Sequence, residues 1–165
     1  LEVFGMPAEN LDRPVIGMIS RIVAQKGFDL ILAAAEELMQ MDLTLVILGT
    51  GEQTFVDLLV ALARRYPDRL GLRVAYDEAL AHKIIAGADL LLIPSLSEPC
   101  GLTQMYSLKY GTVPVVRATG GRDESVEPYD AVTGQGTGFK FSEYTAAAMT
   151  AAIRSALSVY RERDA

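Results

Sequence analysis

The sequence is poor in the residues that build metal sites and disulfides, with one cysteine, one histidine and no tryptophan among 165 residues. A single cysteine cannot form an internal disulfide, and one cysteine with one histidine leaves a zinc site short of ligands. We therefore expect neither a structural metal nor an oxidising compartment.

Long apolar runs and clustered basic residues are missing too. The longest apolar runs, at 43–49 and 88–94, are far shorter than the roughly 20 residues that cross a bilayer. No charged and then apolar signal segment opens the chain. The formal net charge of -6 argues against a broad nucleic-acid surface. We expect a cytoplasmic protein without membrane or nucleic-acid partners, in which 1–165 form one domain.

Apolar segments rich in β-branched residues alternate along the chain with segments of helical spacing. The near-continuous apolar character of the strand segments favours a parallel sheet that is covered on both faces. The predicted fold class is a doubly wound α/β domain, whose ligands bind beyond the carboxyl ends of the strands. The predicted strands are 15–20, 43–49, 70–76, 88–94 and 112–118, and the predicted helices are 28–41, 52–66, 78–87, about 101–110 and 145–162.

The residues after the predicted strands bring two cations, glycine turns, an aromatic ring and a carboxylate to one edge of the sheet. A helix beginning near Gly101 would direct free N–H groups and its positive dipole end toward this edge, which suits a phosphate. Arg21 and Lys26 could add charge-assisted bonds to a diphosphate. Glu98, beside a proline after a buried strand, needs a donor such as a sugar hydroxyl or a cation.

Several of these signals also have an ordinary structural explanation. Arg21 and Lys26 can belong to a solvated loop, and Tyr76 can be half-buried packing. The segment 49–51 lacks the third glycine of a dinucleotide fingerprint and the Lys-Ser/Thr of a P-loop, so it is interpreted as a turn. His82 lies within a predicted helix and is not expected to be catalytic.

Five stretches in order resemble the bacterial glycogen synthase and plant starch synthase family of retaining glucosyltransferases, whose two-domain architecture is called GT-B. The resemblance runs from about Phe4 to Arg161. It implies that the chain is the Rossmann-like C-terminal, nucleotide-sugar half, with the N-terminal acceptor and catalytic domain absent from this chain. The stretches are SRIVAQKGFDLI, ILGTGE, YDEALAHKIIAGADLLLIPS, EPCGLTQMYSLKYGTVPVVRATGG and TGQGTGF.

The resemblance also implies roles for single residues. Arg21 and Lys26 would hold the distal phosphate of ADP as it leaves, and Glu98 would contact the transferred glucose, so these three form the expected catalytic set. Tyr76 would stack on the adenine and Tyr106 would lie by the ribose. The full donor-binding set that it implies is Tyr76, Cys100, Gly101, Leu102, Thr103, Tyr106, Thr119, Gly120 and Gly121.

The implied reaction moves glucose from ADP-glucose to the non-reducing end of an α-1,4-glucan with its configuration retained, without a cofactor or metal. The partners would be the nucleotide sugar and, through the missing domain, the glucan acceptor. The isolated chain would bind nucleotide and catalyse little. Two departures stand out: Leu96 and Ser97 replace a common Arg-Phe pair, and Arg122 follows the Gly-Gly pair where an aliphatic residue is usual.

Two other interpretations remain open at this stage. The chain could be a nucleotide-sensing or regulatory module that kept the fold and lost turnover. It could also be a flavodoxin-like or receiver-type domain, which predicts a bound flavin or an acidic cluster at the strand ends.

Overall fold

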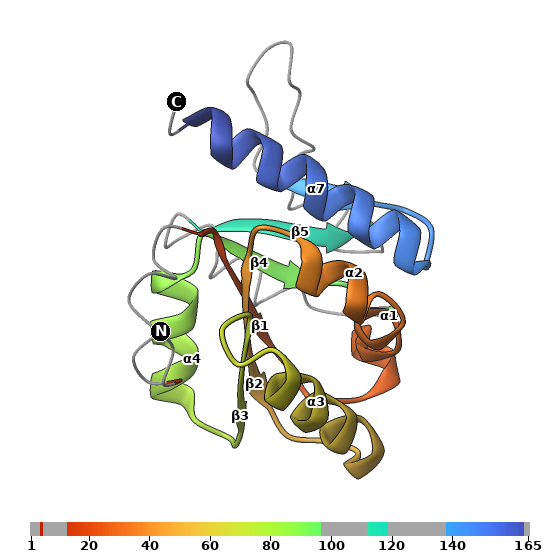
Figure 1. Cartoon of the computed structure of the whole chain (residues 1–165), viewed down its shortest axis with the longest axis vertical. Helices are drawn as coiled ribbons and strands as arrows, with labels where there is room; N and C mark the ends of the chain where they lie inside the picture. The colour runs from red at the N-terminus through yellow and green to blue at the C-terminus, as the bar shows by residue number, and fades with distance from the viewer. Residues whose placement is uncertain (1–3, 5–12, 97–111, 119–137, 164–165) are drawn as a thin grey trace.

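The computed structural model describes residues 4, 13–96, 112–118 and 138–163. In these residues a six-stranded, wholly parallel sheet forms the centre of the molecule, with the strand order β3-β2-β1-β4-β5-β6 (Figure 1). The strands are β1 (Val15–Ile19), β2 (Thr44–Gly49), β3 (Leu70–Val74), β4 (Leu90–Ile93), β5 (Val113–Arg117) and β6 (Phe139–Phe141).

Helices cover both faces of this sheet. Figure 1 shows α4 on one side and α1, α2 and α3 on the other, and α7 packs on the same apolar cluster as these three. This confirms the doubly wound fold class. The helices are α1 (Phe28–Ala33), α2 (Ala35–Gln40), α3 (Gln53–Arg65), α4 (Glu78–Gly87) and α7 (Ala146–Arg163), with a short 3-10 turn η3 (Ala24–Lys26).

The pleat of β2 explains why the strand segments are continuous apolar runs in the sequence. Leu45 and Ile47 point into the cluster under α1, α2, α3 and α7, whereas Val46 and Leu48 pack against α4. All six residues of β2 are buried. A strand with helices on both faces needs apolar side chains at every position, so alternation with polar residues is lost.

The strand order places a topological switch point between β1 and β4. The chain runs from β1 outward to β2 and β3, then returns to add β4 on the other side of β1. This is the Rossmann order, and ligands of such sheets bind at the carboxyl edge where the order reverses. A flavodoxin-like domain has its first strand paired differently, with the order 2-1-3-4-5, so that alternative is wrong.

The ends of two helices follow from local chemistry. Helix α3 ends at Arg65, two residues before Pro67, with cations in its last turn facing the negative end of the dipole. Helix α4 begins after Asp77, whose carboxylate accepts a hydrogen bond from the Leu80 N–H at 2.9 Å. In the described part of the chain, no helix has both the length and the apolar character to cross a bilayer.

The structure corrects the predicted elements in two places. The helix predicted over 28–41 is divided at Ala34 (φ -97°, ψ 7°), although Ala34 N–H still bonds to Leu30 O and its carbonyl still accepts from Leu38 N–H. The strand β6 was not predicted, because it has three residues and follows a glycine-rich segment. The helix predicted near 101–110 lies outside the described residues.

Candidate functional site

Two adjoining pockets flank the carboxyl end of β1. The first, of about 200 Å³, lies between the ends of β1 and β4, and the second, of about 300 Å³, lies toward the ends of β2 and β3. Ile19, Ser20 and Arg21 line both pockets. The pair therefore occupies the edge of the sheet at which the strand order predicts a ligand.

The loop after β1 is fixed by bonds to the loop after β2. Ile22 donates its N–H to Thr50 O at 2.7 Å, and its carbonyl accepts from Glu52 N–H at 2.9 Å. The Ile22 side chain is fully buried, whereas Arg21 before it is exposed. The anchored backbone thus holds Arg21 at the border of both pockets.

Gly49 permits these two loops to lie against each other. A Cβ atom at this position would stand 1.9 Å from Ser20 O, closer than any side chain allows. The segment 49–51, interpreted from the sequence as a turn, instead continues β2: Gly49 is its last residue and Gly51 forms a parallel bridge with Ile22.

Gly27 places Lys26 at the first pocket. The backbone of Gly27 is left-handed, with φ 92°, and a Cβ atom there would lie 2.6 Å from both Pro94 Cγ and Pro94 O. Only glycine meets both conditions without strain. Two residues before Gly27, the Gln25 carbonyl accepts a hydrogen bond from Leu96 N–H at 2.9 Å, so the 3-10 turn is held against the end of β4.

The lining of the two pockets differs in charge. Among the residues that the structure describes, the first pocket is lined by two cations, Arg21 and Lys26, and by no acidic side chain. The second has a largely apolar lining that includes Tyr76, with Arg21 on one side and Asp77 and Glu78 at the start of α4. Tyr76 is 90% exposed, so its ring is open to a planar ligand. An anionic group fits the first pocket and a flat, uncharged group fits the second.

The structure thus brings together three of the residues singled out from the sequence. Arg21 and Lys26 line the first pocket, and Arg21 and Tyr76 line the second. Ser20 and the buried Ser95 also line the first pocket, and since both follow strand ends the edge rule could have included them as candidates. The other predicted residues lie outside the described ones: Glu98, Cys100, Gly101, Leu102, Thr103, Tyr106, Thr119, Gly120 and Gly121.

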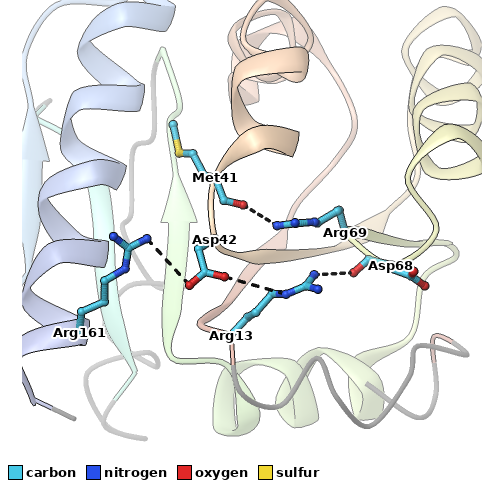
Figure 2. A network of polar contacts seen from close by, with 6 residues as sticks. All are labelled: Arg13, Met41, Asp42, Asp68, Arg69 and Arg161. Atoms are coloured by element: carbon cyan, nitrogen blue, oxygen red, sulfur yellow. Dashed lines mark hydrogen bonds and ion pairs between the residues drawn. The ribbon is translucent and has the colours of Figure 1, made fainter. Parts of the chain in front are cut away.

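The opposite edge of the sheet carries a different polar network (Figure 2). Asp42 lies between two guanidinium groups, with Arg13 Nε at 4.0 Å and Arg161 at 3.9 Å. Arg69 donates to Met41 O at 2.7 Å. These contacts join the segments that precede β1, β2 and β3 to the end of α7. They therefore connect four elements of the fold, and none of these residues lines either pocket.

Acidic and sulfur or imidazole ligands do not gather anywhere in the described ranges. No group of three or more His, Cys, Asp or Glu side chains within residues 4, 13–96, 112–118 and 138–163 is arranged to hold a metal ion.

Comparison with known proteins gives a consistent relationship. Residues 3–165 match the family model described as "Glycosyl transferases group 1". The chain is 51% identical to the glycogen synthase of Koribacter versatilis over 165 residues, and 53% identical to that of Anaeromyxobacter sp. (strain K) over 161. These matches cover 100% and 98% of the chain and 34% of each relative.

A solved structure is also similar. The catalytic domain of starch synthase IV from Arabidopsis thaliana, bound to ADP and acarbose, superposes with a TM-score of 0.85 at 34% identity. The superposition covers 96% of this chain and 34% of that one. The chain thus spans about a third of the length of the proteins it resembles.

Proposed function

Because the chain belongs to the family of group 1 glycosyl transferases, we propose that it is the donor-binding part of a glucan synthase. The reaction is transfer of glucose from ADP-glucose to the non-reducing end of an α-1,4-glucan, with retention of configuration. The similarity to glycogen synthases supports the glucan product. The α-glucan acceptor binds to a part of the protein outside this chain, and the chain alone catalyses little. A cytoplasmic location belongs to the same proposal.

The position of Arg21 between two pockets of different character carries this proposal. A nucleoside diphosphate has a flat base at one end and concentrated negative charge at the other. Its base fits against the exposed ring of Tyr76, and its diphosphate extends past Arg21 toward Lys26. The ADP bound to the similar starch synthase supports a nucleotide of this class.

The chemistry follows from the charge of the leaving group. When the glycosidic bond to the diphosphate breaks, negative charge develops on the distal phosphate. Preorganised cations at that point stabilise the transition state more than the ground state. Arg21 supplies a planar fork of donors and Lys26 a point charge, so the site needs no metal for this step. We assign Glu98 to the transferred glucose, and Cys100, Gly101, Leu102 and Thr103 to glucose and phosphate, by resemblance.

Retention sets a further condition on the mechanism. Retaining glycosidases use two carboxyl groups about 5 Å apart, whereas the motif around Glu98 offers one. We therefore assign much of the rate to electrostatic stabilisation of the departing diphosphate by Arg21 and Lys26.

Calorimetric titration of the chain with ADP, AMP and UDP in the presence of a chelator tests the proposal. We expect metal-independent binding that is tighter for ADP than for AMP, because the distal phosphate adds contacts to the cations. Equal affinity for ADP and AMP, or no binding of either, would contradict the proposed site. Glucose transfer from ADP-glucose to glycogen by the full-length protein then separates a synthase from a nucleotide-sensing module.

The substitution Lys26→Ala tests the phosphate contact itself. Loss of one charge-assisted hydrogen bond should weaken ADP binding about tenfold or more, while adenosine binding stays unchanged. Lys83→Ala is the matched control, since Lys83 is exposed on α4 and lines neither pocket. Equal losses for ADP and adenosine would remove the phosphate role of Lys26.

A further inference from the structure

The Tyr144 hydroxyl reaches the turn that carries Lys26 from a position 120 residues further along the chain. Tyr144 lies in the connection between β6 and α7, and its Oη is 2.5 Å from Asp29 Oδ1 and 3.1 Å from Ala24 O. A phenol has one proton to donate. The short contact is therefore a charge-assisted hydrogen bond to the Asp29 carboxylate, and the Ala24 carbonyl accepts a weaker second bond from the same proton. Ala24 begins η3 and Asp29 lies in the first turn of α1, so this one hydroxyl spans Lys26 and Gly27.

Arg117, at the end of β5, supports Tyr144 from the other side. Its guanidinium carbon lies 5.3 Å from the centre of the Tyr144 ring, a cation–π distance. The same side chain donates to Leu96 O at 2.8 Å, and Leu96 N–H donates to Gln25 O at 2.9 Å. The contacts thus close a ring that joins the turn after β1, the end of β4, the end of β5 and the start of α7.

Apart from the bond to Tyr144, the turn is held by backbone hydrogen bonds, from Leu96 N–H to Gln25 O and from Gly27 N–H to Ala24 O. The N-cap of η3 has no side-chain hydrogen bond, and Ala24 and Gln25 are exposed. A lysine ammonium sits on a flexible four-carbon stem, so a shift of the backbone at Lys26 also shifts the position of its charge.

We propose that Tyr144 is a positioning residue, which holds the η3 turn so that Lys26 faces a diphosphate in the first pocket. This inference rests on the proposed function, because it concerns the same phosphate site. Tyr144 lines neither pocket and acts only through the turn. Burial, and then the bond to Asp29, raise the pKa of the Tyr144 phenol, so the hydroxyl keeps its proton and remains a donor.

The substitution Tyr144→Phe tests the proposal, because it removes one oxygen and leaves the ring on Arg117. We expect ADP affinity to fall about threefold to tenfold, the effect of one lost hydrogen bond, with adenosine affinity unchanged. Tyr66→Phe is the matched control, since the Tyr66 hydroxyl also bonds to a carboxylate, Glu36 at 2.7 Å, and lines neither pocket. It should leave both affinities unchanged.

A double substitution separates positioning from a general loss of structure. In a Lys26→Ala background the Tyr144→Phe change should have no further effect on ADP affinity, because the group it positions is gone. Losses that multiply in the double variant, or equal losses for ADP and adenosine, would overturn the proposal.

Amide hydrogen exchange distinguishes failure of this inference from failure of the proposed function. Exchange across 23–28 should be faster in Tyr144→Phe than in Tyr66→Phe, and unchanged exchange would overturn the positioning role whether or not ADP binds. If the parent chain binds no ADP, the proposed function and the diphosphate role of Tyr144 both fail. Faster exchange would in that case establish only the contact between Tyr144 and the turn.

Discussion

Replacing Gly27 by alanine is the most direct test of how the turn after β1 is built. The added methyl group lowers stability for two reasons, the left-handed backbone of Gly27 and its contact with Pro94. An L-residue in the left-handed region loses about 1–2 kcal/mol, and the φ of Gly27 is 92°. Overpacking in a tight region costs about 1–3 kcal/mol, and the new Cβ would lie 2.6 Å from Pro94 O. We therefore expect a loss of about 2–5 kcal/mol in the free energy of unfolding.

The assay is urea denaturation followed by far-UV circular dichroism. Gly87→Ala is the matched control, because a Cβ atom at Gly87 meets no heavy atom within 4 Å and the residue closes helix α4. Alanine is favoured over glycine in a helix by up to about 1 kcal/mol, so this variant should be as stable as the parent or slightly more so. Equal midpoints for the two variants would refute the close approach of the turn to Pro94.

Three further predictions concern Asp77, which lines the second pocket, and Glu36 and Tyr144, which line neither. Asp77→Ala should lower the free energy of unfolding by about 1 kcal/mol, measured by denaturation, because it removes the cap of α4; no change would contradict the cap. The hydrogen bond from Tyr66 lowers the pKa of the Glu36 carboxyl group. The Glu36 carboxylate therefore stabilises the fold above its unfolded pKa, and this stabilisation is lost as the pH falls through its folded pKa. NMR titration should show this pKa rising in Tyr66→Phe, and an unchanged value would count against the bond. Burial raises the pKa of the Tyr144 phenol. Its contribution to the free energy of unfolding is therefore complete below the unfolded pKa of about 10 and is lost as the pH rises through the folded pKa. An ultraviolet titration in which every tyrosine ionises near the unfolded value would disprove this.

The sheet could be predicted well from the sequence, because burial on both faces leaves an unbroken apolar signal in each central strand. Residues 44–49 show this most clearly, since all six are buried and the prediction was 43–49. The strand β6 gives no such signal, because it lies at the edge of the sheet and has three residues, of which two are only half-buried. The break between α1 and α2 at Ala34 also leaves no signal in the sequence, since the surrounding alanines suit an unbroken helix.

The candidate site was predictable where the position in the sheet decides it. Arg21, Lys26 and Tyr76 each follow a strand, and the carboxyl ends of parallel strands share one edge. Tyr144 was not predictable in this way, because its partners lie 115 and 120 residues earlier and nothing in the intervening sequence links them. A tyrosine before a helix is an ordinary residue until the fold places Ala24 and Asp29 beside it.

The central place of β1 in the sheet has a consequence for how the chain is made. Of the six strands in this sheet, β1 is made first, and β2 and β3 can add to one side of it while the ribosome is still at work. Its other side waits for β4, and the bond from Val15 N–H to the Asp89 carboxylate joins residues 74 apart. Until then the nascent chain exposes an unpaired strand edge, which is a template for pairing with other chains. A polypeptide ending between α4 and β4 should therefore aggregate, and chaperone binding during translation should be strongest in that interval.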